Sequence, residues 1–137
     1  MTAATAAAPR SIGRSVLAIV AGLAFSVLLA LGIDMILHAL QVFPPWDQPM
    51  TETSDAALAF SYRAVIAIGS GYLAARLAPS APMKHAIILG MIGMTLATLG
   101  LIGAVTMKMG PLWYPAALVI TALPLAWIGG ALAHRRA

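Results

Sequence analysis

An aspartate and an arginine lie inside long apolar segments of this chain, where charged side chains are rare. Asp34 lies near the end of the first apolar segment, and Arg63 lies near the start of the second. An ionisable side chain is costly to place in hydrocarbon, so each of these residues is a candidate functional residue by default. Two opposite charges at the same depth can also neutralise each other, which is the cheapest way to keep both within a membrane.

The sequence predicts a polar cluster around this pair, with His38 and Tyr62 as its other members. His38 follows Asp34 by one helical turn, and Tyr62 directly precedes Arg63. Such a cluster can carry a proton, or it can bind an anionic or quinone-like headgroup. It can also be an ion pair that fixes how two helices pack, and we favour this structural interpretation. One carboxylate and one histidine do not make a metal site, so no metal is expected.

The composition requires a membrane. The chain is 61% hydrophobic and only 9% charged, with a mean hydropathy of +0.94, whereas a soluble domain is about 25% charged. A spanning helix needs roughly 20 apolar residues, and four stretches of the chain meet that requirement. We therefore predict an all-α membrane protein with four transmembrane helices, at about 13–40, 55–77, 83–107 and 115–134.

These four helices should form one membrane domain over residues 13–137. Residues 1–12, an alanine- and threonine-rich lead with a proline, are expected to be disordered. The first apolar run is longer than the ~7–15 residues of a signal-peptide core, so it should be a retained helix. Pro44 and Pro45 end it, because proline cannot continue a helix.

Basic residues are distributed asymmetrically about the predicted spans. Six fall on one side of the membrane if the helices alternate in direction, and only Lys108 falls on the other. The positive-inside rule then places both termini in the cytoplasm, with the protein in the cell inner membrane. This distribution also accounts for the net charge of +4, so no nucleic-acid partner is expected. The six are Arg10, Arg14, Arg76, Lys84, Arg135 and Arg136.

Aromatic residues agree with this arrangement. Most lie at the predicted outer level, where membrane proteins carry belts of tryptophan and tyrosine. That outer group consists of Phe43, Trp46, Phe60, Tyr62, Trp113 and Tyr114.

Small residues recur every four positions along the first two helices, beside the charged pair. Positions four apart share a helix face, and stripes of small residues let helices approach closely in lipid. With a rise of 1.5 Å per residue, Asp34 and Arg63 both lie about 9–10 Å inside their apolar segments. We predict that the four helices form two antiparallel hairpins. Aligning Asp34 with Arg63 fixes the register between the first two helices. It places Ala30 against Ala67, Ser26 against Gly71, and Gly22 against Ala75.

The glycines of the third helix should serve close helix packing in the same way. They are Gly90, Gly93, Gly100 and Gly103.

An enzymatic function is not expected, and no cofactor is implied. The chain has no cysteine and no nucleophile–base, phosphate-loop or HExxH motif. The first interpretation is a structural or accessory membrane protein whose Asp34–Arg63 pair fixes helix packing. The alternative is a small proton-coupled or anion transporter that uses Asp34, His38 and Arg63. Only a transporter needs a water-accessible cavity that reaches Asp34. Because four short helices enclose little volume, a homo-oligomer or a subunit of a larger membrane complex is expected.

Three segments resemble small, uncharacterised bacterial four-helix integral membrane proteins. They are Gly-Tyr-Leu-Ala-Ala-Arg-Leu-Ala-Pro at 71–79, Pro-Met-Lys-His-Ala at 82–86, and the stretch from Leu-Trp-Tyr-Pro to Trp-Ile-Gly-Gly within 112–130. The resemblance implies the fold and carries no activity. The chain is also similar in helix count to small multidrug-resistance transporters, which depend on a glutamate early in the first helix. Asp34 instead lies near the far end of its helix, so drug–proton antiport is not expected.

The charge distribution makes a testable prediction about orientation. A reporter fused to the C-terminus should be active in the cytoplasm, because six basic residues hold that side inside. A cysteine introduced at Glu52 should react with an impermeant reagent from outside the cell. Labelling at position 52 only after lysis would contradict the predicted orientation.

Overall fold

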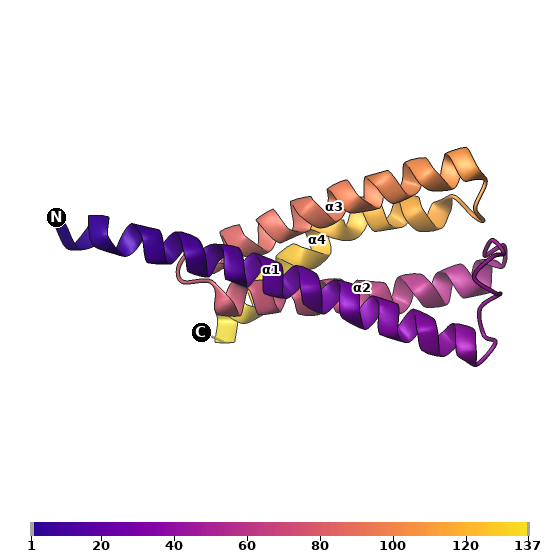
Figure 1. Cartoon of the computed structure of the whole chain (residues 1–137), viewed down its shortest axis with the longest axis horizontal. Helices are drawn as coiled ribbons and strands as arrows, with labels where there is room; N and C mark the ends of the chain where they lie inside the picture. Colours follow the sequence, from indigo (N-terminus) through magenta and orange to yellow (C-terminus); the bar gives the residue numbers. More distant parts are fainter. Residues whose placement is uncertain (1, 137) are drawn as a thin grey trace.

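The computed structural model describes residues 2–136 and contains four helices in that range (Figure 1). They are α1 (Thr2–Ala39), α2 (Thr53–Leu77), α3 (Pro82–Met107) and α4 (Trp113–Arg136). Each helix contains a segment long and apolar enough to cross a membrane. The prediction of an all-α protein with four membrane-spanning helices is confirmed, and its helix limits agree with the structure to within a few residues, except at the start of α1.

The first helix begins earlier than expected. Its backbone is helical from Thr2, whereas its membrane-compatible part starts at Ile12. The sequence predicts disorder for residues 1–12, whereas residues 2–12 are helical in the structure. Alanine has the highest intrinsic helix propensity, and this segment is rich in it.

Residues with left-handed backbone conformations mark three helix ends. Gln41 (φ 61°) follows α1, Ala81 (φ 46°) precedes α3, and Lys108 (φ 53°) ends α3. A left-handed residue stops the helical path and turns the chain, as C-caps commonly do. Pro82 then begins α3, where its missing N–H costs nothing.

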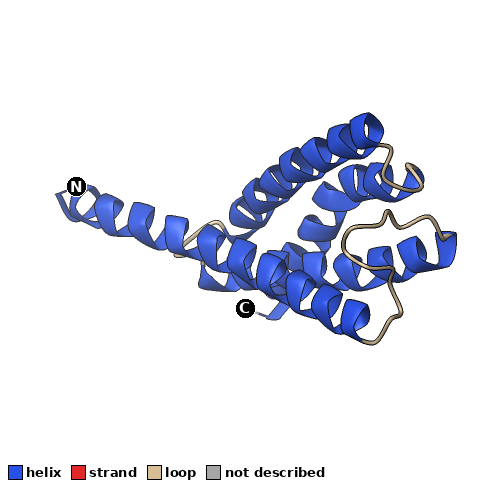
Figure 2. Cartoon of the chain, turned by 45° about the vertical axis from the view of Figure 1, so that its right-hand side comes forward, coloured by secondary structure: helices blue, strands red, loops and turns tan. Residues whose placement is uncertain are grey.

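The helices form two antiparallel hairpins, α1–α2 and α3–α4, which meet at one end and diverge toward the other (Figures 1 and 2). Both termini and the α2–α3 turn lie at the end where the hairpins meet, which we call the terminal end. The connections 40–52 and 108–112 lie at the opposite end, which we call the loop end. The two views agree that α1 and α3 separate progressively toward the loop end.

Glycines bring helix backbones into direct contact at the terminal end. A Cβ built on Gly71 would lie 2.5 Å from the carbonyl oxygen of Ala126 in α4. Gly129 of α4 faces the backbone of Ile68 and Tyr72 in the same way. Even a methyl group does not fit at these two glycines, so α2 and α4 pack at the closest distance that helices allow.

Alanines and glycines continue this packing between α3 and α4. Gly90 faces Ala126, and Gly130 faces Ala86. Gly93, Gly100 and Gly103 differ, since nothing lies within 4 Å of a Cβ built on any of them. The expectation that all the glycines of α3 serve helix packing is therefore wrong for these three.

The predicted register between α1 and α2 is also wrong. Gly22 faces the carbonyl oxygen of Ser70 at 2.9 Å and the Cβ of Ala74 at 3.2 Å, rather than Ala75. Gly71 faces α4 rather than Ser26. A helix turns once per 3.6 residues, so a stripe in steps of four drifts by about 40° per step. Two steps after Arg63, the stripe has rotated away from α1 and onto α4.

The backbone contact between α2 and α4 can be tested with Gly129→Ala. The added methyl group meets the α2 backbone, so the change should destabilise by about 1–3 kcal/mol, as overpacking typically does. Gly32→Ala is the matched control, because nothing lies within 4 Å of a Cβ at Gly32, and it should not destabilise. Unfolding in mixed micelles measures both, and equal losses would contradict the contact.

Candidate functional site

A cavity of about 780 Å³ lies between the two hairpins and is lined by residues of all four helices. It occupies the region where the hairpins diverge toward the loop end (Figure 1). Its walls are formed mainly by small and aliphatic side chains. They include Ser26, Ala30, Ala67, Gly93, Leu96, Ala97, Gly100, Gly103 and Leu118.

The glycines of α3 explain part of this space. Gly93, Gly100 and Gly103 line the cavity, and each has open space where a side chain would project. Ala30 and Ala67, expected to pack against each other, both line the cavity as well. The small residues near the loop end therefore leave room between the hairpins, whereas those near the terminal end close it.

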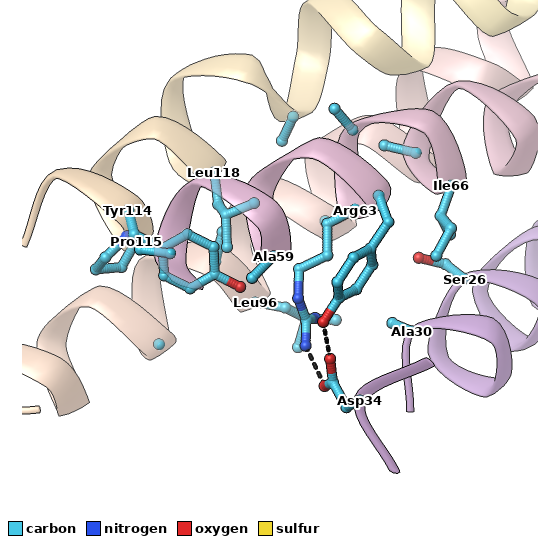
Figure 3. Close-up of a pocket in the computed structure, with 18 of the residues that line it drawn as sticks. Ser26, Ala30, Asp34, Ala59, Arg63, Ile66, Leu96, Tyr114, Pro115 and Leu118 are labelled. Atoms are coloured by element: carbon cyan, nitrogen blue, oxygen red, sulfur yellow. Dashed lines mark hydrogen bonds and ion pairs between the residues drawn. The ribbon is translucent and has the colours of Figure 1, made fainter. Parts of the chain in front are cut away.

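Asp34, Tyr62 and Arg63 meet in this cavity (Figure 3). The hydroxyl group of Tyr62 donates a hydrogen bond to Oδ1 of Asp34, and Nη2 of Arg63 donates one to Oδ2. Both carboxylate oxygens are thus engaged, one by a neutral donor and one by a charge. The Asp34 side chain is 15% exposed and that of Arg63 is 31% exposed, so the pair is only partly buried.

His38 lies at the edge of this group and does not bond the carboxylate. Its Nδ1 donates to the backbone carbonyl of Asp34 at 2.6 Å. Its ring stacks on Trp46, with the centroids 3.7 Å apart and the planes 7° apart. The structure therefore places His38 at the base of the 40–52 connection, where it holds an aromatic side chain near the mouth of the cavity.

Tyr114 is a member of the site that the sequence does not predict. It lines the cavity from α4, and its hydroxyl group points toward the Arg63 side chain (Figure 3). The sequence suggests only an interfacial aromatic residue at this position. Its position in the first turn of α4, at the loop end of that helix, is the one sequence signal that could have joined it to the pair, because spacing does not reveal which helices of the two hairpins touch.

Arg63 keeps hydrogen-bonding capacity that the protein does not use. Its Nε is buried without a hydrogen-bond partner among the described residues. A guanidinium group carries five N–H donors and no acceptor. The site therefore has more donors than acceptors, since Asp34 is the only carboxylate that contacts Arg63 within residues 12–135.

The deeper wall of the cavity offers few free polar groups. Ser70 and Thr121 line it, but the hydroxyl group of Ser70 donates to the carbonyl of Ala67 at 3.0 Å. The hydroxyl group of Thr121 donates to the carbonyl of Ala117 at 2.7 Å. These two side chains are satisfied by their own helices, and Ser26 of α1 adds one further hydroxyl group to this wall, so the charged groups of the cavity lie only near Arg63.

The connection between α1 and α2 reaches across the mouth of the cavity. Phe43, Trp46 and Met50 belong to it and line the cavity. The carbonyl group of Met50 lies against Gly110 in the connection of the other hairpin, where no side chain intervenes. The segment 40–52 thus links the hairpins at the loop end (Figure 2).

Fold and site together define a four-span integral membrane protein with a partly polar cavity between two hairpins. No protein-family model, curated protein or solved structure matches the chain. The resemblance noted from the sequence is therefore supported only at the level of four long apolar helices.

The ion pair predicts unequal effects of single and double substitution. Arg63→Ala strands the Asp34 carboxylate and should cost more than Arg63→Ala combined with Asp34→Ala. Breaking a fully buried pair costs ~3–5 kcal/mol, and we expect less here because Arg63 is partly exposed. Tyr62→Phe should cost about 1 kcal/mol, the usual worth of one hydrogen bond. Unfolding in mixed micelles is measured for the unsubstituted protein, for these three variants and for Asp34→Ala alone. Additive losses from Arg63→Ala and Asp34→Ala would show that the two side chains do not interact.

Proposed function

We propose that this protein is a small transporter that binds an anionic solute at Arg63 and couples it to protonation of Asp34. The observation that carries the proposal is the cavity of about 780 Å³ that reaches the Asp34–Arg63 pair. A purely structural pair is best sealed from solvent on all sides, since water weakens its attraction. An open cavity therefore favours the transporter over the accessory role that the sequence alone suggests.

Competition for one guanidinium group supplies the coupling. At rest the Asp34 carboxylate accepts a hydrogen bond from Nη2 of Arg63. A proton that binds Asp34 removes its negative charge and leaves Arg63 free for another anion. An anion that binds Arg63 displaces the carboxylate and so favours its protonation. Because binding free energies are reciprocal, each event promotes the other by the same factor.

The packing suggests how access alternates. The terminal end is closed by the contacts of Gly71 and Gly129 with the opposing backbone, whereas the cavity lies toward the loop end, where segment 40–52 reaches across its mouth. Rocking one hairpin against the other would exchange these two conditions around a fixed site. Such rigid-body rocking of packed units is common among secondary transporters.

The remaining features of the proposal follow from the sequence. The protein is non-enzymatic, needs no cofactor and resides in the cell inner membrane. Both termini are cytoplasmic, so the loop end and the mouth of the cavity face outward. Four helices that expose large apolar side chains on most of their outer faces suit a homo-oligomer or a subunit of a larger membrane complex.

Two-sided access is the property that separates a transporter from a structural protein. The chain has no cysteine, so a single introduced cysteine reports without background. Ala97→Cys places a thiol in the cavity. It should react with an impermeant methanethiosulfonate from the loop side, and more slowly from the terminal side, in vesicles of opposite orientation.

The control is Leu99→Cys, two residues along the same helix. Leu99 is 61% exposed and does not line the cavity, so in a bilayer it faces lipid and should be unreactive from either side. Reaction at position 97 from the loop side alone would contradict alternating access and would return the pair to a structural role.

A further inference from the structure

We infer that the solute is a single-chain amphiphile with an acidic head, held with its head at Arg63 and its tail between the hairpins. This inference rests on the proposed function and assigns the chemical class of its substrate. It depends on three features of the cavity: where its polar groups lie, what its deep wall can bind, and where its side opens.

The charged and phenolic groups of the cavity lie at one level. Tyr62 and Arg63 of α2, Asp34 of α1 and Tyr114 of α4 all lie there. The lining then continues along α1 from Asp34 to Leu23, a depth of about 16 Å at 1.5 Å per residue. A ligand that fills this space needs one polar end and a long apolar remainder.

The deep wall suits hydrocarbon better than water. A bound water molecule needs two to four polar partners. The hydroxyl groups of Ser70 and Thr121 donate to carbonyls of their own helices. Leu23, Leu89 and Leu125 also line the cavity at this depth, and Ser26 adds one hydroxyl group. A hydrophilic anion would meet at most the Ser26 hydroxyl group in this region, whereas an alkyl chain matches the rest of its apolar surface.

The side of the cavity between α1 and α3 opens toward lipid. Gly22 and Leu89 bring the two helices into contact near the terminal end, and the helices then diverge (Figures 1 and 2). Val27 of α1 and Leu96 of α3 both line the cavity, yet they are 53% and 49% exposed. They therefore form a rim whose outer surface meets the bilayer, and an amphiphile can enter from the membrane through it.

The excess of donors at the site selects an acidic head. Arg63 has a buried Nε without a partner, and the Tyr114 hydroxyl group points toward the same guanidinium. When Asp34 is protonated, Arg63 and both tyrosine hydroxyl groups can donate to one carboxylate or phosphate. Charged, multiply donated hydrogen bonds of this kind are the strong ones. An ammonium head would instead face an uncompensated guanidinium.

The acidic head has two possible sources, a free single-chain acid or an anionic phospholipid. The cavity volume lies within the range of about 300–1,000 Å³ typical of small-molecule sites, so we commit to the single chain. The test uses the full chain in phosphatidylcholine nanodiscs with radiolabelled dodecanoate, and empty nanodiscs correct for partition. Dodecanoate should bind saturably, and butanoate, dodecanol and dodecyltrimethylammonium should each compete at least tenfold more weakly than unlabelled dodecanoate.

Two substitutions locate the tail. Ala97→Phe fills the cavity and should weaken dodecanoate binding at least tenfold, whereas Leu99→Phe on the lipid face of the same helix should leave it unchanged. Gly93→Leu also projects into the cavity, from a position with open space around it. It replaces Ala97→Phe in this test if that variant does not fold. Arg63→Gln combined with Asp34→Asn should abolish the preference for dodecanoate over dodecanol without stranding a charge.

Several outcomes would overturn the inference. Equal competition by dodecanol would show that the head is not recognised. Equal effects of Ala97→Phe and Leu99→Phe would show binding to the outer surface only. Displacement of dodecanoate by phosphatidylglycerol added to the nanodiscs, at comparable mole fraction, would identify the phospholipid as the ligand. Two-sided cysteine reactivity at position 97 without dodecanoate binding would overturn this inference alone. If dodecanoate binds but the cysteine at position 97 reacts from one side only, the proposed transport is contradicted and the proposed binding site stands.

Discussion

The contact between the backbones of α2 and α4 is the constraint on which the rest of the structure depends. At Gly71 and Gly129 no side chain separates the two helices, so the hairpins meet at the closest possible distance. Away from this contact the two hairpins separate progressively toward the loop end (Figures 1 and 2). The cavity between the hairpins is the result, and its position near the loop end follows from where the glycines lie.

The ion pair and this contact act on different parts of the molecule. Asp34 and Arg63 belong to α1 and α2, so their attraction stabilises one hairpin. Tyr114 belongs to the other hairpin and reaches the pair across the cavity. A movement of one hairpin against the other would therefore keep the ion pair and change the distance to Tyr114. Asp34, Tyr62 and Arg63 thus form a fixed part of the site within one hairpin. The position of Tyr114 relative to them depends on the angle between the two hairpins.

Lipid makes an open cavity of this kind tolerable. Between transmembrane helices there is no hydrophobic driving force, because lipid tails are as apolar as leucine. A soluble protein would collapse around such an apolar space, whereas here hydrocarbon can fill it at little cost. The polar side chains are different, because each must find a partner or a ligand inside the membrane. This difference explains why the walls consist mainly of alanine, glycine and leucine while the ion pair and both tyrosines meet at one level.

Composition and hydropathy alone determine the four helices, because a bilayer demands about twenty apolar residues per span and few other sequences supply them. The rarity of charge in those spans also singles out Asp34 and Arg63, which the structure places in contact. The register beyond that pair was not readable, since a four-residue stripe rotates around the helix and its members Arg63 and Gly71 face different neighbours. Nor could spacing distinguish the glycines that join helices from Gly93, Gly100 and Gly103, which border empty space. Which partner each face meets, and that Tyr114 completes the site, depended on the angle between the hairpins. That angle is decided by the fit of four backbones at once, a property that no single segment of sequence contains.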